Sequence, residues 1–420
     1  MPAFAELPPF PTLVGLLALL LGVVSVALAW NASRPFFRSG VLGALSFFAG
    51  WLTCELAAHQ VIVQTFVLGF LVWLGALDTT YGLVGTGLTI GSFVALIRLH
   101  RRGLLAEQAT RAAVIETFGE EFVGPPKPFS LRSVSRPFNL AHRSVTVRSG
   151  VEFAEVEGTR LYADVYHHKD MPEGGPVLVY VHGGAWVLGQ KSYQGVPLMM
   201  RLAALGWVCV SIDYRLSPRF KFPAHIEDVK RGIVWAKKNA RDFGGDPSFV
   251  ALSGNSAGGH LAALAALTPD VKQFQPGFED EDASVDTCVT FYGVYDFTNS
   301  HGTWPGRGPV PFLERFVMPK RLAEDPELWR LASPIAQVRR DAPPFFIIHG
   351  EKDSLVPVTE GRAFARALRA VSEAPVVYAE IPDAQHAFDV FRSVRGHLTL
   401  RAVVSFLQRM VATRRDAPKE

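Results

Sequence analysis

A serine within a glycine-containing pentapeptide is the first feature of the sequence that can do chemistry. Ser256 is the centre of the motif GNSAG at positions 254–258, which follows an apolar run at 250–252 and precedes a helical run at 260–267. A serine hydroxyl is a weak nucleophile unless a sharp turn presents it and a base takes its proton. The two glycines of the motif have no Cβ that would crowd such a turn. The pattern therefore predicts a nucleophilic Ser256 at a strand–turn–helix corner.

A pair of glycines after another apolar run predicts a binding site for a developing negative charge. His182, Gly183 and Gly184 directly follow the run at 177–181. Backbone N–H groups that no side chain obstructs stabilise the oxyanion that forms in acyl transfer. We expect the N–H groups of Gly183, Gly184 and Ala257 to form this oxyanion hole. His182 is interpreted as a structural residue of the loop.

A base and an acid follow in the chain order that this architecture requires, serine first, then acid, then histidine. Asp353 lies in the loop after the apolar run 345–348, and His386 lies in the loop after the run 376–379. The carboxyl ends of parallel strands are where open α/β sheets place their sites. We expect His386 to take the serine proton and Asp353 to fix its tautomer. Glu351 is the local alternative to Asp353.

The chain after about residue 140 alternates short apolar runs with helical periods, which predicts an α/β fold with a mostly parallel sheet between helices. The expected strands are 144–148, 160–166, 177–181, 208–212, 250–252, 288–292, 345–348 and 376–379, and the expected helices are 196–205, 226–239, 260–267 and 388–411. An irregular, aromatic-rich insertion at 296–334 separates two strands. We expect it to form a cap over the site with an acyl pocket, although surface packing explains its apolar residues almost as well.

The first quarter of the 420-residue chain is hydrophobic and nearly uncharged. Apolar blocks cover 12–30, 41–58, 61–77 and 81–97, which is the length needed for three or four membrane-spanning helices. A helical hairpin packed on the catalytic domain is the alternative. Glu55 lies in or at the edge of the second block and has no evident role.

Three regions follow from these patterns: a transmembrane region at 1–103, an amphipathic helix and linker at 104–143, and a catalytic domain at 144–420. The arginines Arg34 and Arg38 follow the first block, and Arg98, Arg101 and Arg102 follow the last. The positive-inside rule places both groups in the cytoplasm, whereas three intervening spans would separate them. The larger second group favours a multi-pass membrane protein with a cytoplasmic catalytic domain.

Composition argues against several other functions. A net charge of +3 gives no sign of nucleic-acid binding. Cys54, Cys209 and Cys288 lie in apolar runs and are expected to be buried, and no motif suggests a metal or nucleotide site. We expect Arg215 and Asp228 to pair as part of the scaffold.

Over half of the chain, from about residue 177 onward, resembles the hormone-sensitive-lipase-like branch of the α/β-hydrolases. The motifs are HGGAW (182–186), DYRLSP (213–218), FPAHIEDV (222–229), GDPSFVALSGNSAGGHLA (245–262), HGEKDSLVP (349–357) and DAQHAF (383–388). With the hydrophobic N-terminus, the chain looks like the membrane-bound carboxylesterases of mycobacteria and related actinobacteria.

This resemblance implies hydrolysis of carboxylic esters without metal or organic cofactor. The implied partners are a small ester or lipid substrate and membrane lipids. The chain has Ala185-Trp186 where many members have a third glycine. Because that form also resembles prenylcysteine methylesterases and arylformamidases, the substrate stays open. A non-enzymatic membrane module on a hydrolase fold is the remaining alternative.

Overall fold

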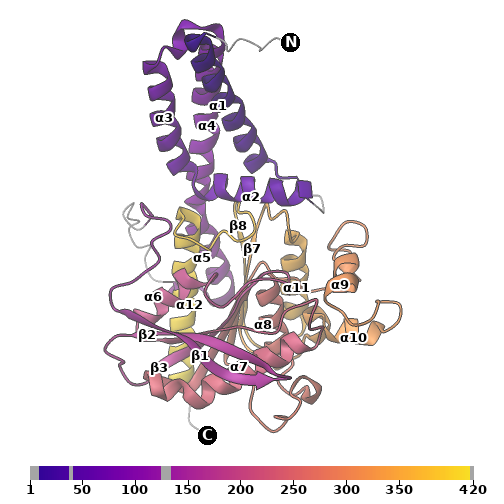
Figure 1. The fold of residues 1–420 in the computed structure, drawn as a ribbon. Coiled ribbons are helices and arrows are strands. Elements are labelled where there is room, and N and C mark those ends of the chain that lie inside the picture. The colour runs from indigo at the N-terminus through magenta and orange to yellow at the C-terminus, as the bar shows by residue number, and fades with distance from the viewer. Residues whose placement is uncertain (1–8, 37–40, 124–133, 417–420) are drawn as a thin grey trace.

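One sheet runs through the C-terminal part of the chain and carries the elements that position the site (Figure 1). The computed structural model describes residues 9–36, 41–123 and 134–416. Within them the sheet has eight strands in the order β1-β2-β4-β3-β5-β6-β7-β8. The strands are β1 Val145–Val156, β2 Thr159–His168, β3 Gly175–Val181, β4 Val208–Ile212, β5 Gly245–Asn255, β6 Thr287–Phe291, β7 Phe345–Gly350 and β8 Val376–Ile381. The pairs β1–β2 and β2–β4 are antiparallel, and every pair from β4 to β8 is parallel.

Helices cover both faces of this sheet. They are α5 Leu105–Phe118, α6 Val196–Ala203, α7 Ala224–Asn239, α8 Ala257–Leu267, α9 Val310–Phe316, α10 Pro326–Leu331, α11 Val358–Val371 and α12 Val394–Asp416. Alternate side chains of β3 point to opposite faces, as strand geometry requires. Val177, Val179 and Val181 belong to one core cluster with residues of α7 and α8, whereas Leu178 and Tyr180 belong to a second cluster with residues of α6 and α12. The predicted mostly parallel sheet between helices is confirmed.

The start of the predicted C-terminal helix is wrong by six residues. The sequence analysis placed it at 388, but α12 begins at Val394. Ser393 stands before the helix, and its Oγ accepts the N–H of Gly396 at 2.9 Å, as an N-terminal capping residue does. The segment 388–393 therefore belongs to the loop that carries His386. The linker residues Pro125, Pro126, Lys127 and Arg132, and also Arg38, lie outside the described residues.

The N-terminal region forms a separate helical stalk. Its helices are α1 Phe10–Ser33, α2 Val41–Glu55, α3 Ala57–Trp73 and α4 Thr80–Gly103. Figure 1 shows α1, α3 and α4 side by side above the sheet, with α2 lying across their base. Helices α1 and α4 approach closely through small residues, because a Cβ on Gly85 would lie 2.3 Å from the backbone of Ala18. Such small-residue contacts are typical of helix pairs in membranes.

Length and composition allow some of these helices to cross a bilayer. In the described part of the chain, Phe10–Ser33 and the continuous Thr80–Phe118 are long and apolar enough. Helices α2 and α3 pass the same test only as a pair, and that pair is bent by 88°. The prediction that each apolar block is helical is confirmed, but the second block does not run parallel to the others.

Helix α2 ends in a buried ion pair with the catalytic domain, and this gives Glu55 a role. The Glu55 carboxylate pairs with the guanidinium of Arg395 on α12, and both side chains are almost fully buried. Arg395 also donates through Nε to the carbonyl of Pro382 at 3.1 Å. Two charges so deeply buried are tolerated only as a pair. The ion pair therefore fixes the base of the stalk to the start of α12.

Removal of one member of this pair should destabilise the protein. We expect Glu55→Leu to cost about 3–5 kcal/mol, because it leaves the Arg395 charge buried without its partner. The double variant Glu55→Leu/Arg395→Met, which removes both charges, should recover most of that loss. The free energy of unfolding, measured on the purified proteins in detergent, tests the single and the double variant. Equal stability of Glu55→Leu and wild type would contradict the structural role of the pair.

Candidate active site

Ser256 lies at a strained corner between β5 and α8. Its backbone has φ +55° and ψ −123°, a conformation that costs a non-glycine residue of the order of 1–3 kcal/mol. A Cβ on Gly254 would lie 2.3 Å from the carbonyl oxygen of Gly258, and one on Gly258 would lie 2.1 Å from that of Val181. The expectation that both positions must lack a Cβ is confirmed. The strain is characteristic of a residue held in place for function.

The loop after β3 lies directly against this corner. A Cβ on Gly183 would lie 2.9 Å from the Cβ of Ser256, so the two backbones touch. Gly184 has φ +127°, a conformation that favours glycine. His182 is buried, stacks on Tyr214 with ring centroids 4.4 Å apart, and has a pKa lowered by burial. These contacts fit the structural role that the sequence suggested for His182.

The three amides expected to form the oxyanion hole are not equivalent. The N–H of Gly183 donates to Oε1 of Gln194 at 2.6 Å. This amide therefore holds the loop 190–195 in place and is not free for an oxyanion in this structure. The amides of Gly184 and Ala257 remain the principal candidates. Gln194 could not be identified from the sequence because no motif includes it.

Asp353 and His386 are brought together at the carboxyl ends of β7 and β8. His386 Nδ1 lies 2.6 Å from Oδ2 of Asp353. The other carboxylate oxygen of Asp353 accepts the N–H groups of Leu355 and Val356 at 2.9 and 2.8 Å. Burial raises the pKa of Asp353, but His386 and His349 outweigh it and lower the pKa to about 2. An ionised Asp353 holds the proton of His386 on Nδ1 and leaves Nε2 to act as the base.

The alternative acid, Glu351, points elsewhere. Its carboxylate accepts the N–H of Asp383 at 2.8 Å and lies 3.6 Å from Arg102 at the end of α4. It is also partly exposed, whereas Asp353 is fully buried. The geometry therefore favours Asp353 as the partner of His386.

Ser256 and His386 both lie beside the end of β6. The N–H of Ser256 donates to the carbonyl of Phe291 at 2.9 Å. The ring of His386 packs against the next residue, Tyr292, with centroids 4.3 Å apart. The nucleophile corner and the histidine loop thus meet on one strand end. This is the convergence that the order of the motifs predicts.

A polar network behind the site links the same two loops. Asn255, next to the nucleophile, donates through Nδ2 to the hydroxyl of Tyr292 at 2.9 Å. That hydroxyl donates in turn to the carboxylate of Asp389 in the histidine loop. Burial raises the pKa of Asp389 to about 6, although the Tyr292 hydroxyl stabilises its charge. No sequence motif indicates this network, because its members are far apart along the chain.

Helix α2 covers the histidine loop. Phe47 meets the ring of His386 edge-on at 6.1 Å, and the indole N–H of Trp51 donates to the carbonyl of Ala387 at 2.9 Å. The Sγ atom of Cys54 lies 3.7 Å from the main-chain carbonyl oxygen of Asp383. The side-chain carboxylate of Asp383 also forms an ion pair with Arg102. Residues of the stalk therefore contact the main chain on both sides of His386.

The insertion at 296–334 contributes mainly to the core of the domain. Trp329 is fully buried, and its indole N–H donates to the carbonyl of Lys320 at 3.0 Å. Leu313 and Val317 are also fully buried in the core. The packing interpretation of the insertion is thus favoured over an acyl pocket. Helix α2, which the sequence analysis assigned to the bilayer, is the element that lies over His386.

The scaffold residues behave as expected. Arg215 pairs with Asp228 through Nε at 2.8 Å, which confirms the predicted contact. The three cysteines Cys54, Cys209 and Cys288 are free and buried, as predicted.

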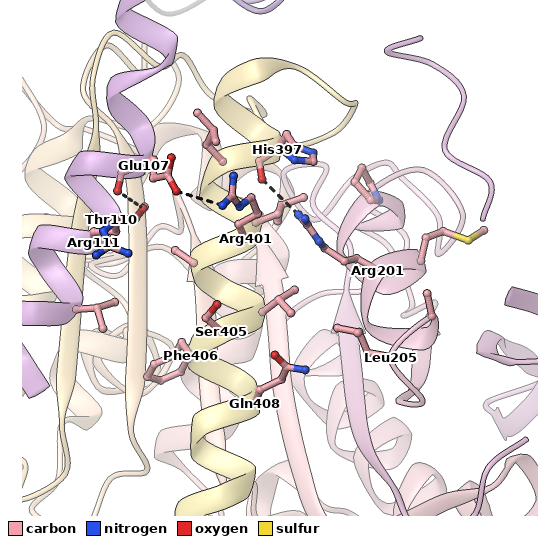
Figure 2. A pocket seen from close by; sticks show the side chains of 18 of the residues that line it. Glu107, Thr110, Arg111, Arg201, Leu205, His397, Arg401, Ser405, Phe406 and Gln408 are labelled. Carbon is pink, nitrogen blue, oxygen red and sulfur yellow. Dashed lines mark hydrogen bonds and ion pairs between the residues drawn. The ribbon is translucent and has the colours of Figure 1, made fainter. Parts of the chain in front are cut away.

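A hollow lies between α5, α6 and α12 (Figure 2). Its volume is about 850 Å³. Arg201 reaches across it toward the main chain of His397 at 3.4 Å. Burial, Arg401 and Arg392 together lower the pKa of Arg201 to about 10. Ser256, Asp353 and His386 are not among the residues that line the hollow.

Comparison with known proteins agrees with the fold and with hydrolysis of carboxylic esters. A family model described as BD-FAE matches residues 163–368. The probable carboxylic ester hydrolase LipM of Mycobacterium tuberculosis (strain ATCC 25618 / H37Rv) is 39% identical over 409 residues, which are 94% of each chain. Esterase LipQ of the same organism is 43% identical over 327 residues, which are 75% of this chain and 77% of LipQ. The native structure of Thermogutta terrifontis esterase 2 covers 68% of this chain and 98% of its own, with a TM-score of 0.54 and 24% identity, and supports the fold.

Replacement of the aspartate tests the paired loops. We expect Asp353→Asn to lower kcat for ester hydrolysis by about 10³–10⁴, because an amide no longer fixes the His386 proton on Nδ1. Because the pKa of Asp353 is about 2, its carboxylate is ionised above about pH 4, so the loss should be present throughout the neutral pH range. Glu351→Gln is the matched control and should keep wild-type kcat. A larger loss in Glu351→Gln than in Asp353→Asn would reverse the assignment.

Proposed function

The chain belongs to the hormone-sensitive-lipase-like branch of the α/β-hydrolases and hydrolyses carboxylic esters, and we propose that it does so as a membrane-anchored serine esterase. The observation that carries this proposal is the hydrogen bond between His386 and Asp353 beside the strained corner at Ser256. This arrangement brings together the base His386, the buried carboxylate of Asp353 and the hydroxyl of Ser256.

The proposed reaction proceeds in two halves. Ser256 Oγ attacks the ester carbonyl while His386 Nε2 takes its proton, and the amides of Gly184 and Ala257 stabilise the negative oxygen. His386 then gives the proton to the leaving alkoxide, which departs as the alcohol and leaves an acyl group on Ser256. Water, activated by the same imidazole, hydrolyses this acyl-enzyme and releases the acid.

Loss of the serine hydroxyl should abolish both labelling and turnover. We expect Ser256→Ala to lose reaction with a fluorophosphonate probe and hydrolysis of p-nitrophenyl esters, because no other group can form the acyl-enzyme. Ser253→Ala is the matched control, since that hydroxyl is buried three residues away. Labelling gels and ester assays on the purified protein measure both. Full turnover by Ser256→Ala would refute the mechanism.

Membrane anchoring is supported by the exposed surface of the stalk. Large apolar side chains face outward on α1, α3 and α4, including Leu20, Phe66 and Val94. Their exposure in water would be unfavourable, whereas lipid tails cover such side chains without cost. Helix α3 has 17 residues, at the lower end of the length for a span. We propose that α1, α3 and α4 span the bilayer.

Three spans resolve the conflict between the two groups of arginines. Arg34 directly follows α1. The backbone carbonyl of the preceding residue, Ser33, accepts a hydrogen bond from Nζ of Lys352 in the catalytic domain at 2.8 Å. Arg102, at the end of α4, pairs with Asp383 of the same domain. Arg34 and Arg102 thus lie on the side of the catalytic domain, because α2 lies across the stalk and does not reverse its direction. The positive-inside rule then places this domain in the cytoplasm.

Cysteine labelling in intact cells tests this orientation. Asp78→Cys lies in the turn between α3 and α4, and Asp280→Cys lies on the exposed surface of the catalytic domain. We expect a membrane-impermeant thiol reagent to label the first variant in intact cells and the second only after permeabilisation. The native cysteines are buried and give a low background. The opposite pattern, or equal labelling of both variants in intact cells, would contradict the topology.

A further inference from the structure

One face of α2 is apolar and uncovered. Leu42, Leu45 and Phe48 are 67%, 61% and 55% exposed, and Leu52 continues the same face. Their spacing of three, three and four residues places them on one side of a helix. We call these four residues the α2 stripe. A contiguous exposed apolar surface of this kind marks a contact with lipid or with a partner.

The opposite face of the same helix packs on the catalytic machinery. Phe47 is only 6% exposed and lies edge-on to His386. A Cβ on Gly50 would lie 3.5 Å from Nε2 of Gln385, the residue before the catalytic histidine. A helix with its side chains is about 10–12 Å thick. The α2 stripe is therefore separated from the imidazole by the thickness of a single helix.

The orientation of α2 identifies lipid as the occupant of the stripe. Helix α2 meets α3 at 88°, so if α3 spans the bilayer then α2 lies in the plane of its surface. Helix α2 lies across the base of α1, α3 and α4 (Figure 1), and large apolar side chains are exposed on all four helices. Helix α2 carries no charged residue before Glu55, which is buried. An exposed apolar face held in that plane is covered by acyl chains below the headgroups, where it avoids contact with water.

Exposed apolar side chains also lie on the loops around Ser256. Leu188 is exposed, and its side chain lies 3.2 Å from where a Cβ on Gly184 would stand, beside an expected oxyanion amide. Leu355, two residues after Asp353, is also exposed. Exposed apolar side chains therefore flank the oxyanion loop and the acid loop as well as the histidine loop. The carboxyl edge of the sheet faces the stalk.

We infer that the enzyme takes long-chain esters directly from the bilayer, with α2 as the interfacial helix along which they reach Ser256. This inference rests on the proposed function and names its substrate class. The hydrocarbon chain stays among the lipid tails while the ester carbonyl, which lies at the headgroup boundary, enters beside α2. Hydrolysis consumes one water and returns a fatty acid and an alcohol.

Charged substitutions on the α2 stripe should lower the turnover of a substrate dissolved in the lipid but not that of a substrate dissolved in water. The full chain is placed in phosphatidylcholine nanodiscs that contain p-nitrophenyl palmitate, and p-nitrophenyl acetate is assayed in the surrounding buffer. We expect Leu42→Asp/Leu45→Asp to lower palmitate turnover about tenfold or more, because the charged face is expelled from the lipid boundary. Acetate turnover should stay at the wild-type level, since neither residue contacts the catalytic groups.

The matched control is Val371→Asp, an exposed apolar residue at the end of α11, near the amino-terminal edge of the sheet. It should leave both rates unchanged. An unchanged ratio of palmitate to acetate turnover in the stripe variant, whether both rates hold or both fall, would overturn the inference. Failure of the proposed function gives a different result: wild-type protein inactive on both esters, or Ser256→Ala as active as wild type.

Discussion

The hydrogen bond between His386 and Asp353 is the interaction on which the rest of the structure depends. Asp353 is anchored by the turn that follows β7, whereas His386 lies on a long loop that the sheet alone does not hold. Helix α2 supplies the missing support, through the indole of Trp51 and the ring of Phe47. The 2.6 Å contact between His386 and Asp353 is thus supported partly by the N-terminal helices.

The stalk is for this reason part of the catalytic unit and more than a tether. Its base is joined to the domain by the ion pairs Glu55–Arg395 and Arg102–Asp383, which bracket the histidine loop. A buried charge without its partner destabilises the folded protein. The stalk and the domain must therefore pack in the one arrangement that forms these ion pairs. The same docking places the carboxyl edge of the sheet, where Ser256, Asp353 and His386 lie, beside the N-terminal helices.

Local patterns made the sheet and the contact of Asp353 with His386 predictable. Ser256, Asp353 and His386 each follow an apolar run, and the rule that sites gather at strand ends brings them together. The role of α2 was not predictable, because an apolar helical face looks the same in the sequence whether it meets lipid or protein. The bond from Gly183 to Gln194 was equally hidden, since it joins two loops by tertiary contact alone.

The most direct test of this account is a structure of the full chain in a lipid nanodisc after reaction with a long-chain phosphonate ester. The account predicts phosphorus bonded to Ser256 Oγ, its oxygen within hydrogen-bond distance of the Gly184 and Ala257 amides, and the alkyl chain leaving beside α2 into the lipid. Phosphorus on another residue, or His386 turned away from the adduct with α2 still in place, would contradict it.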